Sequence, residues 1–239
     1  MELHNDNCFN ILPTLKDNSV DLVLVDLPYG QTACKWDVCI DLNKMWEQLK
    51  RIGKENTAFI FFTTTKFGFD LINSNKKWFR YDIVWEKTNT VGHLSANKMP
   101  LRKHEMIYVF YKKLPTYNPQ KIPMDNPDVR NRGEEEVITG TYGTIKRKGI
   151  DVYTDRHPVS IQKFKSQVHN SLKHSTQKPV EACEWLIKSY SNEGDVVLDF
   201  TMGSGSTGVA CKNTNRKFIG VEMDEEIFKT AEERLITNI

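Results

Sequence analysis

The chain has 239 residues, a formal net charge of +2 and 39% hydrophobic residues, which excludes a disordered chain and suits one domain, alone or with an insertion. The N-terminus lacks the features of a signal peptide, and no apolar run approaches the roughly 20 residues of a membrane span. Five scattered cysteines argue against a disulfide framework, so a cytoplasmic protein is expected. The near-neutral charge, averaged over the whole chain, also argues against a nucleic-acid-binding protein.

Apolar patterns predict strands that alternate with helices. Residues 21–25 form a Val-rich run typical of a buried parallel strand, and residues 42–52 carry apolar side chains at helical spacing. Further strands are predicted at 57–63, 81–85, 106–111, 195–199 and 217–221, and further helices at 179–190, 207–213 and 224–235, the last capped by Asp224. The predicted fold is therefore α/β, with a doubly wound, mostly parallel sheet.

One segment departs from this alternation. Residues 112–173 hold twelve Lys and Arg against seven Asp and Glu, so the segment carries +5 and the remainder of the chain −3. It also contains five of the nine prolines and little apolar periodicity. The segment is therefore predicted to be a long, basic, mostly irregular insertion. It is either functional or simply a flexible loop exposed to solvent.

The tetrapeptide Asp26-Leu-Pro-Tyr29 follows the first strong strand, at the edge where open α/β sheets bind ligands. An exocyclic amino group of a base is a poor nucleophile, because its lone pair is delocalised into the ring. The Asp26 carboxylate and the Leu27 carbonyl, held rigid by Pro28, could each accept one N–H and free that lone pair. Tyr29 could then stack on a base taken out of its helix. The alternative is a plain turn that ends the strand.

A glycine-rich turn, residues 201–208, joins the strand at 195–199 to the next helix. A turn of this kind lets the backbone approach a ligand closely, and Glu222 at the end of the following strand is placed to accept hydrogen bonds from a ribose. The spacing of Gly203, Gly205 and Gly208 also suits a nicotinamide dinucleotide. However, Asp199 would repel a pyrophosphate and would attract the α-amino group of S-adenosylmethionine. S-adenosylmethionine is therefore the predicted cofactor, and a purely structural turn is the alternative.

These motifs together resemble the β group of DNA amino-methyltransferases, in which the catalytic motif precedes the cofactor motif. The similarity covers essentially the whole chain, and its most specific feature is the order of the motifs. The matching stretches are Asn18–Leu22, Asp26–Tyr29 (Asp-Pro-Pro-Tyr in the family), His174–Pro179, Leu198–Gly208 and Ile219–Glu222.

The resemblance implies a Rossmann-like, S-adenosylmethionine-dependent methyltransferase fold with circularly permuted motif order and an inserted target-recognition region. It implies a catalytic half at 1–111, target recognition at 112–173 and a cofactor-binding half at 174–239. The catalytic residues would be Asp26, Leu27, Pro28 and Tyr29. The implied cofactor contacts are Asp6, Asn7, Lys178, Asp199, Phe200, Thr201, Gly203, Gly205, Thr207 and Glu222.

Five positions depart from the family pattern. Leu27 replaces the first proline of the catalytic motif, but because the expected contact is a backbone carbonyl, activity should survive. Ser175 replaces a proline, and Thr201 stands where the family usually has Phe. Asp6-Asn7 replaces Gly-Asp, so it stays open which of these two side chains contacts the cofactor adenine.

Duplex DNA is the expected partner, and the resemblance also implies pairing into a homodimer. DNA contacts are predicted at Lys146, Arg147 and Lys148 in the insertion, and at Arg102 and Lys103, for which simple solvation is the alternative. Neither a Cys-x-x-Cys pair nor a tight His pair supports zinc binding, so no metal is expected.

The leading functional hypothesis is methylation of adenine N6 in duplex DNA by base flipping and direct attack, because Asp at position 26 resembles the adenine enzymes more than the cytosine-N4 enzymes. Cytosine-N4 methylation is the alternative within enzymes. A catalytically inactive DNA- or nucleotide-binding module is the alternative from another class.

Overall fold

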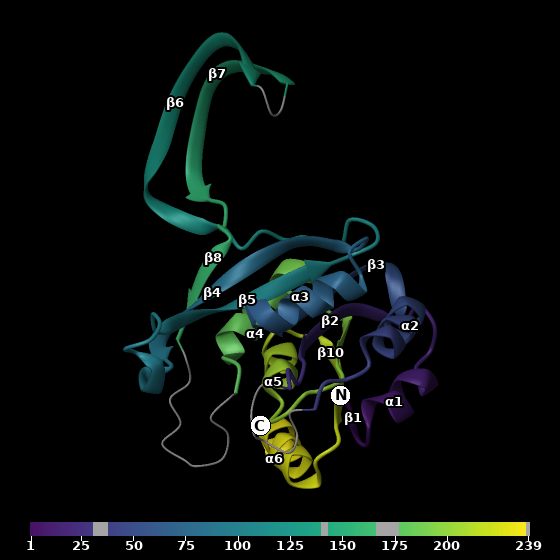
Figure 1. Cartoon of the computed structure of the whole chain (residues 1–239). Helices are drawn as coiled ribbons and strands as arrows, with labels where there is room; N and C mark the ends of the chain where they lie inside the picture. Colours follow the sequence, from purple (N-terminus) through teal and green to yellow (C-terminus); the bar gives the residue numbers. More distant parts are fainter. Residues whose placement is uncertain (31–37, 140–142, 166–176, 238–239) are drawn as a thin grey trace. The chain divides into compact units, whose positions relative to one another are not determined.

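The computed structural model describes residues 1–30, 38–139, 143–165 and 177–237 (Figure 1). Backbone contacts divide the chain into two compact units. One unit joins Met1–Asn118 to Ser160–Ile239, and the other is Pro119–Val159. The second unit is therefore an insertion in the sequence of the first.

The first unit is built on a sheet whose strand order, across the described residues, is β1-β10-β9-β2-β3-β5-β4-β8. Its strands are β1 (Glu2–Asn5), β2 (Val20–Asp26), β3 (Gly53–Thr63), β4 (Phe79–Val91), β5 (Arg102–Phe110), β8 (Ile161–Phe164), β9 (Val196–Asp199) and β10 (Lys217–Glu222). Neighbours from β1 to β3 are parallel, β5 is antiparallel to β3 and β4, and β8 is parallel to β4. The predicted mostly parallel α/β sheet is confirmed.

Helices cover both faces of this sheet. They are α1 (Cys8–Ile11), η1 (Leu12–Thr14), α2 (Leu42–Ile52), α3 (Thr65–Ser74), η2 (His93–Ser95), α4 (Val180–Tyr190), α5 (Ser206–Asn213) and α6 (Glu225–Thr237). In β2, Leu22 and Leu24 face a core shared with α4, α5 and α6, whereas Val23 and Val25 face a core shared with α1, α2 and α3. This alternation explains why the strand is apolar at every position. No helix in the described ranges is long and apolar enough to cross a membrane.

Local capping fixes several predicted boundaries. α2 has the predicted bounds, because the Asp41 carboxylate accepts hydrogen bonds from the N–H groups of Asn43 and Lys44. Asp224 caps α6 through the N–H groups of Glu226 and Ile227, as predicted.

The sequence analysis missed α3, whose fourth residue is the weak helix former Gly68. A β-carbon at Gly68 would clash with the ring of Tyr108 on β5, so close packing onto the sheet requires glycine at this position.

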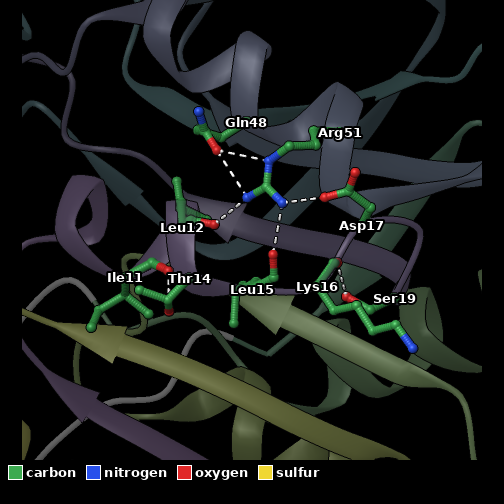
Figure 2. Close-up of polar contacts among 9 residues, drawn as sticks. All are labelled: Ile11, Leu12, Thr14, Leu15, Lys16, Asp17, Ser19, Gln48 and Arg51. Carbon is green, nitrogen blue, oxygen red and sulfur yellow. Dashed lines mark hydrogen bonds and ion pairs between the residues drawn. The ribbon is translucent and has the colours of Figure 1, made fainter.

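Arg51 at the end of α2 ties the segment before β2 to the helix layer (Figure 2). Its guanidinium donates to the carbonyl oxygens of Leu12 and Leu15 at 2.8 and 2.7 Å, and pairs with the Asp17 carboxylate at 2.5 Å. Gln48 accepts two further hydrogen bonds, at 3.1 and 3.0 Å. One side chain thus gives the Leu15 carbonyl a donor, and it gives the Leu12 carbonyl a second donor beside the Leu15 N–H that closes η1.

Replacing Arg51 with Ala is expected to lower the free energy of unfolding by about 2–3 kcal/mol, because the Leu15 carbonyl loses its donor and Asp17 loses its ion pair, while the Leu12 carbonyl keeps only the Leu15 N–H. Urea unfolding monitored by circular dichroism measures the difference. The exposed Lys44 on the same helix provides the control, and Lys44→Ala should change stability by less than about 0.5 kcal/mol. Equal effects of the two substitutions would contradict the assigned role of Arg51.

The second unit is a two-stranded antiparallel hairpin of β6 (Ile122–Thr139) and β7 (Gly143–Arg156). The expectation of a mostly irregular segment was therefore wrong. Val129, Ile150 and Val152 on these strands are 61%, 64% and 58% exposed. A hairpin that has solvent on both faces does not require alternating apolar residues, so the usual sequence signal of a strand is weak here.

Candidate active site

Three acidic side chains stand at the carboxyl ends of adjacent parallel strands. Asp26 ends β2, Asp199 ends β9 and Glu222 ends β10, and these strands are neighbours in the order β10-β9-β2. All three residues line one cavity of about 840 Å³. Ligands of open α/β sheets bind at this edge, so the cavity is the candidate active site.

The cavity brings together most of the residues singled out from the sequence. Gly205, Arg102 and Lys103 are not among its lining residues, and Lys146–Lys148 belong to the second unit. The predicted residues that line it are Asp6, Asn7, Asp26, Leu27, Pro28, Tyr29, Lys178, Asp199, Phe200, Thr201, Gly203, Thr207 and Glu222. The individual role of each remains a prediction.

Both oxygens of the Asp26 carboxylate have protein partners. The Tyr29 hydroxyl donates to Oδ1 at 2.5 Å, and Lys178 Nζ lies 2.5 Å from Oδ2. Burial raises the pKa of Asp26 above its ordinary value, although the charge of Lys178 acts in the opposite direction. Thr201 donates its hydroxyl to the Asp26 carbonyl at 3.1 Å and so ties the turn at Asp26–Tyr29 to the glycine-rich turn.

Two charged residues that the sequence analysis did not select lie behind Asp26. Lys178 Nζ is 3.4 Å from Glu105 Oε2 on β5, and Glu105 also forms a salt bridge with Lys87 on β4. Burial alone would raise the pKa of Glu105, but Lys178 and Lys87 together lower it below its ordinary value. The only feature of the sequence that could have indicated Glu105 and Lys87 is that they are charged residues beside predicted strands.

The glycine-rich turn places two acids around its backbone. Glu222 accepts hydrogen bonds from the N–H groups of Gly203 at 3.0 Å and Asp224 at 2.9 Å. Asp199 is 4% exposed and accepts hydrogen bonds from the Thr207 side chain and the Thr201 N–H. Burial raises the pKa of Asp199 to about 7 and also raises the pKa of Glu222. A buried carboxyl with such a pKa favours a cationic ligand.

The glycines of this turn have different structural tasks. Gly203 has φ +52° and lines the cavity, with nothing near the position of a β-carbon. Gly205 has φ +80° and is the residue before α5, where a β-carbon would press on Ala231 and Leu235. Only Gly203 is therefore positioned to let a ligand approach the backbone closely.

The turn after β1 contains the Asp6-Asn7 pair. Asn7 Oδ1 accepts from the Phe9 N–H and caps α1, whereas Asp6 Oδ1 accepts from Asn10 Nδ2 at 2.8 Å and from the Asn7 N–H at 2.6 Å. Asn7 thus has a structural task in this turn. Asp6 brings the negative charge to this end of the cavity.

The predicted DNA-contacting residues lie on different parts of the chain. Arg102 and Lys103 are exposed at the start of β5, and Lys103 pairs with Glu86 at 3.0 Å. In the hairpin, the register places Lys146, Arg147 and Lys148 opposite Glu136, Glu135 and Glu134. Residues 119–159 hold seven basic and seven acidic residues, so the +5 of 112–173 comes from the segments that flank this unit.

Some predicted features lie outside the described residues or are not tested by them. The stretch His174–Thr176 of the motif before α4 falls outside the described ranges. Within those ranges, no group of three or more His, Cys, Asp and Glu side chains is arranged to hold a metal ion.

Comparison with known proteins finds similarity to DNA methyltransferases, both for a family model and for individual proteins. The model of a DNA methylase family, N6_N4_Mtase, matches residues 20–233. Type II methyltransferase M1.MboII of Moraxella bovis is 27% identical over 96% of this chain and 94% of its own length. M.HpaI of Haemophilus parainfluenzae is 28% identical over 96% of this chain and 72% of its own length.

Solved structures share the fold. The M1.HpyAVI–SAM complex aligns with a TM-score of 0.65 and 23% identity, covering 98% of this chain and 99% of that chain. The PvuII DNA methyltransferase, described as cytosine-N4-specific, aligns with a TM-score of 0.70 and 15% identity, covering 99% of this chain and 87% of that chain.

The burial of Asp199 leads to a stability prediction. Asp199→Asn is expected to raise the free energy of unfolding at pH 8 by about 2–4 kcal/mol and to change it little at pH 4. The folded protein keeps the Asp199 proton up to about pH 7, but the unfolded chain releases it near the ordinary pKa of 3.8, so wild-type stability falls as the pH rises between these values.

Urea unfolding of both proteins at pH 4 and pH 8 measures this difference. Asp70→Asn, at an exposed position on α3, controls for the loss of one negative charge. A pH-independent difference between Asp199→Asn and the wild type would contradict the prediction.

Proposed function

The chain belongs to the DNA methylase family of N6/N4 amino-methyltransferases, and from that premise we propose that it methylates the N6 amino group of adenine in duplex DNA. The observation that carries this proposal is the Asp26 carboxylate, which lines the same cavity as Asp199 and Glu222. A base-activating acid and two cofactor-binding acids in one cavity are what direct methyl transfer to an amino group requires.

S-adenosyl-L-methionine is the methyl donor, and the residues of the cavity fit it. When bound, it supplies an electrophilic methyl group on a sulfonium centre. We assign its α-amino group to Asp199, whose burial favours a cation, and its ribose hydroxyls to Glu222. Gly203 leaves space for its methionine part beside the backbone. M1.HpyAVI, which shares the fold, was solved as a complex with SAM.

The catalytic turn acts on the target base. Asp26 accepts one N–H of the amino group and the Leu27 carbonyl accepts the other, so the nitrogen lone pair is drawn out of the ring and becomes available for attack. Pro28 keeps the Leu27 carbonyl in place. Tyr29 supplies an aromatic face for the flipped base, and its ring is supported by Phe67 with a centroid distance of 5.3 Å.

Cytosine-N4 methylation is the second candidate, since the PvuII enzyme that shares the fold is cytosine-N4-specific. Adenine is favoured by Asp at position 26, in the place where Ser is more usual among cytosine-N4 enzymes. Arg102, Lys103 and Lys146–Lys148 remain the proposed DNA contacts, and a homodimer remains the proposed assembly.

The test is transfer of labelled methyl from S-adenosyl-L-methionine to duplex DNA, followed by digestion and identification of the modified nucleoside. N6-methyl-2′-deoxyadenosine is the expected product, and N4-methyl-2′-deoxycytidine would replace the first candidate with the second. Asp26→Asn should lower kcat at least 100-fold, because an amide accepts the amino N–H less strongly. The exposed Asp70→Asn should retain wild-type activity, and full activity of Asp26→Asn would overturn the mechanism.

The affinity for S-adenosyl-L-methionine should depend on pH. Because the pKa of Asp199 is about 7, the carboxylate that would bind the cofactor ammonium is a minor species at pH 6 and the major one at pH 7.5. The affinity should therefore rise about fivefold to tenfold over this range, with release of a proton on binding. Calorimetry in buffers of different ionisation enthalpy measures both quantities, and Asp199→Asn should bind weakly at either pH.

A further inference from the structure

We propose that Lys178, anchored by Glu105 and Lys87, is a positioning residue that holds the Asp26 carboxylate for the target amino group, and that it does not bind the cofactor. This proposal rests on the function proposed above. It names residues on β4 and β5 whose part in the reaction no motif of the sequence suggested.

The four side chains, which all line the cavity, form a chain of alternating charge. Lys87 pairs with Glu105, Glu105 with Lys178 at 3.4 Å, and Lys178 with Asp26 at 2.5 Å. The side chains of Lys178, Lys87 and Glu105 are only 11%, 16% and 19% exposed. Pairs buried to this degree are far less screened than surface salt bridges, and loss of one member leaves an uncompensated charge.

The two oxygens of Asp26 are held with unequal strength. Lys178 at Oδ2 is charged, is also bound to Glu105, and lies 5.5 Å from the centroid of the Phe62 ring. Tyr29 at Oδ1 contributes a neutral hydroxyl. An incoming amino group that needs an oxygen of Asp26 therefore displaces Tyr29 and takes Oδ1, while Lys178 keeps the plane of the carboxylate fixed.

The hydroxyl of Tyr29 and the target amino group would use the same oxygen of Asp26. Tyr29 donates its hydroxyl to Oδ1, and its ring contacts Phe67. When the amino group takes Oδ1, the Tyr29 hydroxyl gives up this hydrogen bond, while Phe67 still supports the ring. The same oxygen thus brings the base to the side of the carboxylate on which the Tyr29 ring lies.

The charges around Asp26 set the expected pH dependence. Lys178 and Tyr29 lower its pKa, whereas its burial and the negative charge of Glu105 raise it. Asp199 lies close enough for its own pKa to be raised by Asp26, and Lys87 acts through Glu105. Removing the positive charge of Lys178 should therefore raise the pKa of Asp26. Because Asp26 acts as the carboxylate, the acid limb of the pH–rate profile for kcat should move to higher pH.

The test compares Lys178→Met, Lys178→Arg and Glu105→Gln with the wild type. We expect Lys178→Met to bind S-adenosyl-L-methionine within threefold of the wild type by calorimetry, to lose at least 100-fold in kcat, and to shift the acid limb upward by one pH unit or more. Lys178→Arg should restore most of kcat, and Glu105→Gln should lose about tenfold. Lys188→Met, an exposed lysine of α4, is the matched control and should behave as the wild type.

The opposite pattern would overturn the proposal. If Lys178→Met weakens cofactor binding tenfold or more and leaves kcat at saturating cofactor unchanged, the lysine belongs to the cofactor site. If Lys178→Met fails to fold, the double variant Lys178→Met/Asp26→Asn, which removes both charges of the pair, replaces it in the binding measurement. It should bind S-adenosyl-L-methionine within threefold of Asp26→Asn, and binding weaker by tenfold or more would overturn the proposal.

A measurement that does not depend on methyl transfer tests the role of Lys178 separately from the proposed function. Carboxyl ¹³C NMR titration should show a higher pKa of Asp26 in Lys178→Met than in the wild type, whatever the wild-type enzyme methylates. An unchanged Asp26 titration overturns the positioning role, whereas absence of methyl transfer by the wild type overturns the proposed function.

Discussion

Burial of like charges at one edge of the sheet is the constraint on which the site depends. The parallel order β10-β9-β2 brings Glu222, Asp199 and Asp26 to the same cavity, and burial raises the pKa of each. Such a cluster is unfavourable in the absence of cations. The structure relieves it in two ways: Lys178 neutralises Asp26, and Asp199 holds its proton up to about pH 7. Asp199 is the acid proposed above to bind the cationic group of the cofactor.

Different strands supply the two sides of this cavity. On the β9–β10 side, the Gly203 N–H donates to Glu222, and there is open space beside Gly203. On the β2 side, Asp26 and Tyr29 form a turn, and Asp26 pairs with Lys178, which in turn lies beside Glu105 of β5 and its partner Lys87 of β4. Thr201 joins the two sides through the Asp26 carbonyl. A small movement of the glycine-rich turn would therefore reach the turn at Asp26–Tyr29 directly, through one hydrogen bond.

The sequence predicted those parts of the fold and site that depend on neighbouring residues along the chain. The apolar run of β2, the capped helix at 42–52 and the acids at strand ends followed from periodicity and capping. α3 was missed because Gly68 is unfavourable in a helix unless packing against Tyr108 requires it. The hairpin was missed because solvent covers both of its faces. The Lys178–Asp26 pair joins residues 152 positions apart, and only the tertiary fold brings such residues together.

The pairing of β2 with β9 also has a consequence for how the molecule acquires its activity. Thr201 and Asp26 are separated by 175 positions, and Asn5 contacts Glu222 across 217. Contacts of such long range close late and slow the folding of a domain. On the ribosome, the hairpin and the catalytic turn emerge before β9 and β10 exist, so an incomplete chain has no cofactor site. The cavity residues of β9 and β10 are therefore added only after these two strands have been synthesised.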